Sequence, residues 1–99
     1  MNRTKWNKKE DEICCKTIVN EYVIAKRNTS VEDCIKQIHA NADISERDIS
    51  SIRMRIQNIK GILVELDISN TLDITPLANA AMQTRACLIA YLEECKIIK

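Results

Sequence analysis

One stretch in the middle of the chain decides the fold: Arg47-Asp48-Ile49-Ser50-Ser51-Ile52-Arg53-Met54-Arg55-Ile56-Gln57-Asn58-Ile59. Isoleucine recurs in it every three or four residues, which is the period of a helix with one apolar face. Ser45 and Asp48 are both suitable N-cap residues, so we predict a helix that runs from one of them to about Glu65. Gly61 falls on its exposed side. The predicted buried face consists of Ile49, Ile52, Ile56, Ile59 and Leu63.

A longer helix is predicted near the start of the chain. Asn7 is a good N-cap residue, and Glu10 three positions later completes a capping box. Glu10 and Asp11 in the first turn also suit the positive end of the helix dipole. The helix should continue to about Lys26. Its apolar side is predicted to hold Trp6, Ile13, Thr17 and Ile24, widened by Cys14, Ile18 and Ala25.

Cap residues predict two further helical regions. Ser30 with Asp33 starts a short helix that ends near Asn41, with Val31, Cys34, Ile35, Ile38 and Ala42 on one face. Thr75-Pro76 predicts another start, because Thr can cap a helix and Pro is favoured at the first helical position. The C-terminal region is one helix or two, with a break around Ala80-Ala81. Its apolar line is predicted to be Ala81, Thr84, Leu88, Leu92 and Cys95.

Composition favours a helical domain. The 99 residues are 45% hydrophobic and include one Gly and one Pro, which excludes a disordered tail and favours helices joined by turns. We predict a small all-α domain of four to five helices. Residues 1–66 should form a three-helix core of the helix-turn-helix kind, and residues 67–99 a C-terminal helical extension packed on it within a single domain.

The five cysteines, an odd number without framework spacing, predict free thiols in a cytoplasmic protein. No secretory signal and no apolar run of membrane-spanning length is present in the sequence. Cys14 and Cys15 are adjacent and point to different helix faces, so we expect only one of them to face the core. The cysteines and His39 lack the spacing of metal ligands, so no metal site is predicted.

Catalysis is not predicted. No nucleophile–base pair or cluster of carboxylates can be named in the sequence, so we expect no enzyme and no cofactor. The net charge is +1. Function must therefore be sought on a surface.

Two segments resemble a known family. Trp6 followed by Glu10-Asp11 resembles the opening of Myb/SANT-like helical domains, and residues 47–59 are similar to their third helix, although these domains in eukaryotes usually carry three Trp. The likeness is closer to an N-terminal module of bacterial HNH-type and restriction-like endonucleases. In that module a Ser-x-x-x-hydrophobic-Lys/Arg-Asn-hydrophobic segment, here residues 51–59, precedes a Leu-rich helical unit, here Thr75-Pro76-Leu77-Ala78-Asn79-Ala80. The single His excludes an HNH nuclease site, so the resemblance implies a targeting module alone.

The resemblance implies a double-stranded DNA-binding protein whose third helix lies in the major groove. Arg53 and Gln57 would reach base edges, since Arg pairs with guanine and Gln with adenine, and Ser50 would contact a phosphate or a base. The other basic side chains would hold the DNA backbone: Lys5, Lys8, Lys9, Arg47, Arg55 and Lys60. The modest net charge and the ordinary polarity of a solvated helix face weigh against this hypothesis.

The alternative hypothesis is a protein–protein interaction module. It would be a small regulator or inhibitor from a phage or mobile element, for example of a nucleic-acid-guided defence enzyme. The C-terminal run Cys87-Leu88-Ile89-Ala90-Tyr91-Leu92, followed by Ile97-Ile98, is more hydrophobic than one buried face requires. Ile89 and Tyr91 would then contact a protein partner or form a homodimer through the C-terminal helix. Ile89 could instead pack back on the first helix.

Overall fold

Every regular element that the structure describes is helical. The structure is a computed structural model, and it describes residues 5–44 and 46–98. Its elements are α1 (Lys8–Ile18), the π-helical segment η1 (Val19–Ile24), α2 (Val31–His39), α3 (Ile49–Glu65) and α4 (Met82–Glu94). The prediction of a small all-α domain is confirmed.

Three helices begin at the predicted N-cap residues. The cap side chains accept hydrogen bonds from backbone N–H groups three residues later, at 2.8 to 3.1 Å: Asn7 from Glu10, Ser30 from Asp33 and Asp48 from Ser51. The Glu10 carboxylate also accepts from the Asn7 backbone N–H at 2.9 Å, which completes the predicted capping box. Of the two caps predicted for α3, Asp48 is used, and Ser45 lies outside the described residues.

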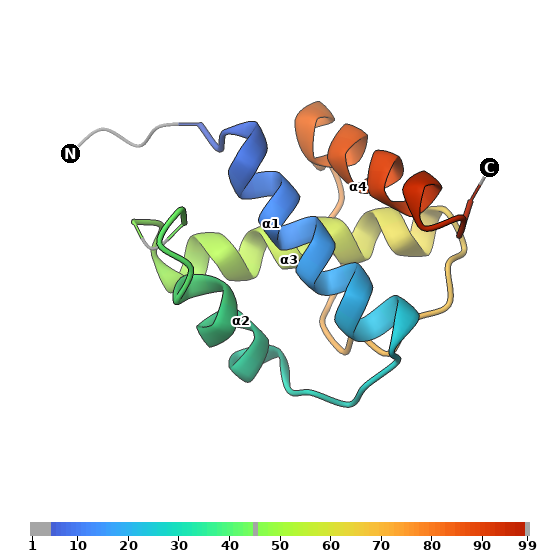
Figure 1. Cartoon of the computed structure of the whole chain (residues 1–99), viewed down its shortest axis with the longest axis horizontal. Helices are drawn as coiled ribbons and strands as arrows, with labels where there is room; N and C mark the ends of the chain where they lie inside the picture. The colour runs from blue at the N-terminus through green and yellow to red at the C-terminus, as the bar shows by residue number, and fades with distance from the viewer. Residues whose placement is uncertain (1–4, 45, 99) are drawn as a thin grey trace.

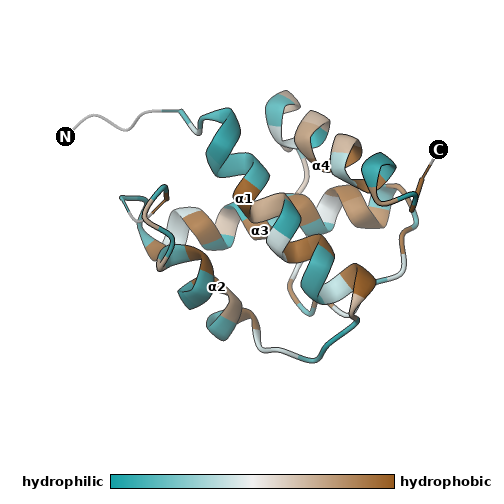
Figure 2. Ribbon diagram, in the orientation of Figure 1, coloured by the Kyte–Doolittle hydropathy of each residue, from teal (hydrophilic) through white to brown (hydrophobic). Residues whose placement is uncertain are grey.

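The helices pack around α1. Figure 1 shows that α1 crosses α3. Helix α4 lies beside α1, and α2 packs against the N-terminal part of α3. In Figure 2 each helix carries both hydrophobic and hydrophilic residues, as expected of helices that bury one side. The fully buried side chains come from η1, from the loop after α2 and from every α-helix, and include Ile18, Tyr22, Ile35, Ile38, Ile44, Ile52, Ile56, Ile59, Leu63, Leu88 and Leu92.

The buried face of α1 differs from the predicted one. Trp6, Ile13 and Thr17 are only partly buried, and Ile24 is 53% exposed. The buried residues are Cys14, Cys15, Ile18, Val19, Tyr22 and Val23. Helices cover α1 on more than one side, so adjacent residues can both be inside. The π-helical segment also adds a residue to the turn, which shifts the face after Ile18. The expectation that Cys14 and Cys15 could not both face the core is wrong.

The buried face of α3 follows the prediction from Ile52 onward. Ile52, Ile56, Ile59 and Leu63 have no exposed surface, whereas Ile49 is 39% exposed. Ile49 is the first residue of α3 and lies between the exposed Asp48 and Ser50 at the edge of the core. The prediction that Ile49 is buried is therefore wrong.

No helix begins at Thr75-Pro76, contrary to the prediction. Residues 68–81 form an irregular connection, and α4 begins after Ala81. The backbone of this connection bonds to other elements: Leu77 N–H donates to Gln57 O at 3.0 Å and Thr71 N–H to Tyr22 O at 2.9 Å. Because these groups already have partners in α3 and η1, the segment does not need a helix of its own to satisfy them.

The same connection covers Gly61. A Cβ atom at this position would lie 2.6 Å from the Leu77 carbonyl oxygen, so only glycine fits there. Gly61 is partly buried, and the expectation that it faces solvent is wrong. No helix in the described part of the chain combines the length and the apolar character needed to cross a membrane.

Candidate functional site

The basic residues predicted to bind DNA fall into different environments, and the first is a network around Trp6. The guanidinium carbons of Arg47 and Arg55 lie 5.1 Å and 4.5 Å from the centre of the Trp6 ring. Both distances are within the range of cation–π attraction. The ring therefore joins the start of the chain to the loop before α3 and to α3 itself.

Arg47 is held by Glu10 through two hydrogen bonds. Its Nε donates to Glu10 Oε2 at 3.0 Å and its Nη2 to Oε1 at 2.8 Å, and Nη2 also donates to the Lys5 carbonyl at 2.8 Å. Both side chains are only 8% exposed. The hydrogen bonds from Arg47 lower the pKa of Glu10 below its ordinary value, against the opposing effect of burial.

Arg55 belongs to a second buried cluster, centred on Asp11. The Asp11 side chain has no exposed surface, and its Oδ1 lies 3.3 Å from Arg55 Nε. The Thr84 hydroxyl donates to Asp11 Oδ1 at 2.9 Å, and the Gln83 amide donates to Oδ2 at 2.7 Å. Gln83 also donates to the Trp6 carbonyl at 2.7 Å, and Arg55 donates to the Thr84 hydroxyl. Arg47 thus links α1 to the loop before α3, and Arg55 links α3 to α1 and α4.

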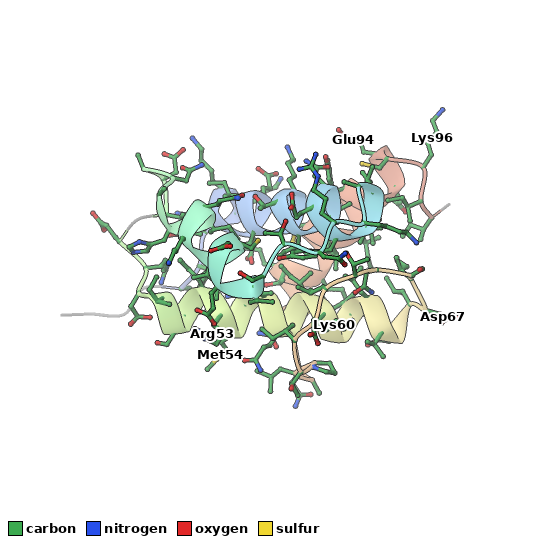
Figure 3. All side chains as sticks on the ribbon, turned by 90° about the horizontal axis from the view of Figure 1, so that it is seen from below. Arg53, Met54, Lys60, Asp67, Glu94 and Lys96 are labelled. Atoms are coloured by element: carbon green, nitrogen blue, oxygen red, sulfur yellow. The ribbon has the colours of Figure 1, made fainter. Side chains whose placement is uncertain are left out.

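The outer face of α3 carries the other predicted DNA contacts. Arg53 and Lys60 are labelled in Figure 3, where α3 lies along the lower edge of the molecule. Arg53 pairs with Glu32 of α2, and these side chains are 39% and 61% exposed. The three other side chains of this helix that were predicted to contact DNA also have partners: Ser50 donates to Asp48, Gln57 to the Thr75 carbonyl and Lys60 to Asn70. Each of these predicted DNA contacts is therefore already bonded to a group of the chain itself.

The three N-terminal lysines do not lie on the outer face of α3. Lys9 forms an exposed ion pair with Asp43 at 3.3 Å. Lys5 is exposed, and its carbonyl accepts from Arg47. Lys8 lines a groove between α1 and α4 instead. The structure does not gather the predicted basic residues into one surface.

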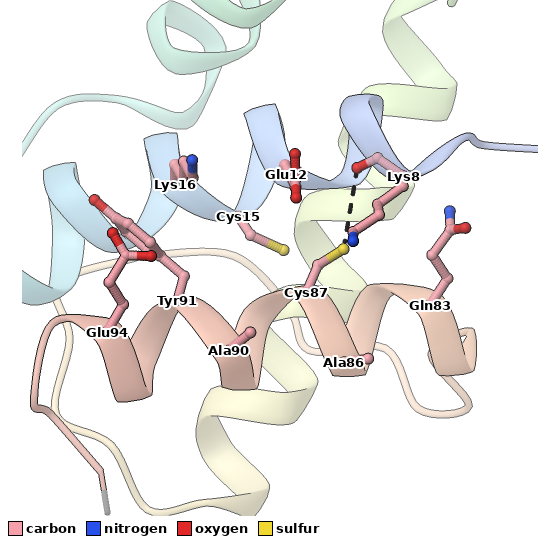
Figure 4. A pocket seen from close by; sticks show the side chains of 10 residues that line it. All are labelled: Lys8, Glu12, Cys15, Lys16, Gln83, Ala86, Cys87, Ala90, Tyr91 and Glu94. Carbon is pink, nitrogen blue, oxygen red and sulfur yellow. Dashed lines mark hydrogen bonds between the residues drawn. The ribbon is translucent and has the colours of Figure 1, made fainter.

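The groove between α1 and α4 is a distinct feature that the sequence did not predict. Its volume is about 400 Å³, and Figure 4 shows the ten residues that line it. The lining includes four small side chains: Cys15, Ala86, Cys87 and Ala90. The charged or larger side chains are Lys8, Glu12, Lys16, Gln83, Tyr91 and Glu94.

The groove thiols behave as apolar groups. Burial raises the pKa of Cys15 and of Cys87, so both thiols are protonated at neutral pH. Cys87 Sγ lies 4.0 Å from the Lys8 carbonyl, and Cys15 Sγ lies 3.9 Å from the Thr84 carbonyl. These contacts make Cys15 and Cys87 small, unreactive parts of the lining.

Of the two residues predicted to form a protein interface, Tyr91 lines the groove and Ile89 does not. Tyr91 lines the groove, its hydroxyl donates to Asn20 Oδ1 at 2.7 Å, and Lys16 Nζ lies 5.6 Å from its ring centre. Ile89 is partly buried but does not line the groove. Ile97 and Ile98, which suggested surplus apolar surface, are partly buried and packed against the core.

The sequence contained one overlooked signal for the Asp11 cluster. Asp11 lies three and four residues before Cys14 and Cys15, so it shares their buried side of α1. An acidic residue on a core face needs a cation or hydrogen-bond donors. The partners, Gln83, Thr84 and Arg55, could not be named because no spacing rule connects positions so far apart in the chain.

Comparison with known proteins adds no relative. No protein-family model, no curated protein and no solved structure matches the chain. Within residues 5–44 and 46–98, no group of three or more His, Cys, Asp or Glu side chains could hold a metal ion. The fold defines a small all-α domain, and the resemblance to Myb/SANT-like domains stays a prediction from the sequence.

Proposed function

We propose that the protein is a non-catalytic module that binds another protein, with the groove between α1 and α4 as its binding surface. The single observation that carries the proposal is an open groove with Ala86 and Ala90 exposed along α4 and apolar thiols beside them. Exposed small side chains between two packed helices allow a third chain to approach closely. Most of a partner's contact there would be apolar, with charged residues at the margin.

The proposal is also supported by how the basic residues are used. Arg47 and Arg55 are occupied by Glu10 and Asp11 in the interior, so they do not offer charge to DNA phosphates. The overall charge of +1 suits a protein partner better than a strongly electrostatic interaction with nucleic acid.

The test fills the groove without changing the core. Ala90→Trp places a large ring on an exposed position of α4, and Gln37→Trp places the same ring on an exposed position of α2 as the control. Each chain would be used to capture interacting proteins from the cells that carry its gene. We expect a partner that is retained by the wild type and by Gln37→Trp but lost with Ala90→Trp. Equal capture by all three chains, or no capture by any of them, would contradict the proposal.

DNA binding is the second candidate, favoured by one observation. Ser50 and Arg53 lie in the first turns of α3, where Ser50 is exposed and the Arg53 side chain is 39% exposed. Recognition helices contact bases mainly through their N-terminal residues. If α3 reads DNA, Arg53→Ala should weaken a preferred site by ~1–3 kcal/mol, whereas Gln57, which the connection before α4 covers, should have a smaller effect. A titration on random duplex DNA at two salt concentrations is the measurement, and absence of binding at low salt would remove this candidate.

A further inference from the structure

The charges on α1 suggest what kind of chain enters the groove. Lys8, Glu12 and Lys16 follow one another at intervals of four residues, so they lie in one row along the helix on the side that lines the groove. Among the described residues, none of these three side chains forms an ion pair. Lys16 does lie over the ring of Tyr91. The row therefore presents the order positive, negative, positive to a partner.

The small side chains fix the shape of the occupant. Ala86 and Ala90 lie one turn apart on α4, and the lining of the groove extends from Gln83 to Glu94 on that helix. The twelve residues from Gln83 to Glu94 are separated by eleven helical steps, a rise of about 16 Å or three turns. A helix of the same length can lie against small side chains at close interaxial distance, whereas a strand would leave its edge groups unpaired there.

We propose that the groove binds a helix of another protein that carries an acidic, a basic and an acidic residue at intervals of four. This inference rests on the proposed function and names the partner of that site. Each charge of the partner would face its opposite on α1, at Lys8, Glu12 and Lys16. A basic residue at the end beside Glu94 would fix the direction of the bound helix, since the row on α1 reads the same in both directions.

A second copy of the chain does not meet this requirement. No position in the 99 residues starts an acidic–basic–acidic series at intervals of four: the series beginning at Glu12, Glu32 and Asp43 each reach a basic residue and then Asn20, Ala40 and Ser51. The α1 row of a second copy would place like charges opposite each other in register. A second copy, shifted by one turn, would pair only two of the three charges, so the occupant that we infer is a different protein.

The test uses two synthetic helical peptides of 18 residues. They share an Ala-rich face and differ only in the order of three charges, Glu-Lys-Glu or Lys-Glu-Lys at intervals of four. Fluorescence anisotropy with labelled peptides measures affinity, and amide shifts in NMR spectra locate the binding site. We expect the Glu-Lys-Glu peptide to bind at least about tenfold more tightly, because three attractive pairs replace three repulsive ones. The preference should shrink at high salt.

Matched variants make the outcome specific. The triple variant Lys8→Glu, Glu12→Lys, Lys16→Glu should reverse the preference between the peptides, whereas Lys36→Glu on α2 should leave it unchanged. Circular dichroism checks that each variant keeps its helices. Equal binding of both peptides, blocked by Ala90→Trp, would overturn the charge inference and leave the proposed function standing. Binding of neither peptide at the groove would also overturn the inference, while the capture experiment independently decides the proposed function.

Discussion

Glu10 and Arg47 form a buried ion pair, and burial decides how much such a pair contributes to stability. Both side chains are 8% exposed and share two hydrogen bonds, so their charges are used inside the molecule. Arg53 and Glu32 form a pair of the same chemical type on the surface. Removing one partner of a buried pair leaves the other charge without compensation, whereas an exposed charge returns to water.

Arg47→Met should therefore destabilise the protein far more than Arg53→Met. We expect a loss of ~3–5 kcal/mol in the free energy of unfolding for Arg47→Met and under ~1 kcal/mol for Arg53→Met. Urea denaturation of both variants measures the difference. Similar losses in the two variants would mean that Arg47 is not the internal residue that the structure describes.

Glu10 also predicts a dependence of stability on pH. Arg47 lowers the pKa of Glu10 below 4.5 in the folded state, so the unfolded chain takes up this proton first as pH falls. The contribution of Glu10 is complete above the ordinary glutamate pKa and is lost as pH drops through the lowered value. Glu10→Gln should be less stable at pH 7 and should lose less stability on acidification. Glu65→Gln, which removes an exposed partner of Arg85, is the control and should keep most of the acid slope. Parallel curves for Glu10→Gln and the wild type would contradict this role.

The connection between α3 and α4 is the element that most changes the surface of α3. It places the Leu77 backbone on Gly61 and Gln57, so this part of α3 is covered. Thr75 and Pro76 were misleading because cap preferences describe where a helix can start. Cap preferences take no account of tertiary hydrogen bonds, and here bonds to α3 hold these residues in an irregular conformation.

Gly61→Ala tests this contact. Alanine favours a helix over glycine by ~1 kcal/mol, but its Cβ would meet the Leu77 carbonyl, and overpacking of this kind costs ~1–3 kcal/mol. We expect a net loss of stability together with faster hydrogen exchange at the Leu77 amide, whose bond to Gln57 would be displaced. A stabilised protein with unchanged exchange at Leu77 would show that the connection does not pack there.

The elements were predictable from sequence to the extent that they depend on neighbouring residues. Asn7, Ser30 and Asp48 mark helix starts through contacts three residues away, and the period of Ile52, Ile56 and Ile59 defines the core side of α3. The Glu10–Arg47 pair, the Asp11 cluster and the groove depend on residues 37 to 79 positions apart. Nothing in local spacing predicts such pairs, so the sequence placed Arg47 and Arg55 on a DNA surface.

The whole molecule should protect its thiols to different degrees. Cys14 and Cys15 have no exposed surface, and burial raises the pKa of both, whereas Cys95 is partly exposed and the five cysteines are free. A thiol reagent added to the native protein should modify Cys95 first. Cys14 and Cys15 should react only when the protein opens globally, at a rate that follows its stability. Mass spectrometry of the partly labelled protein identifies the order. Early labelling of Cys14 would contradict the described core.

The hydrogen bond between Thr84 and Asp11 limits how early the protein can fold while the ribosome is still synthesising it. It joins residues 73 positions apart, and at ~5–20 residues per second the ribosome needs about 4 to 15 seconds to make the chain between them. During that time α1 has no α4 to pack against, and Asp11 lacks the hydrogen bonds from Gln83 and Thr84. The nascent chain must keep its apolar helix faces apart or shielded until Met82–Glu94 has emerged. In a chain truncated before Met82, the side of α1 that packs against α4 would stay uncovered, and chaperones and proteases would act on it.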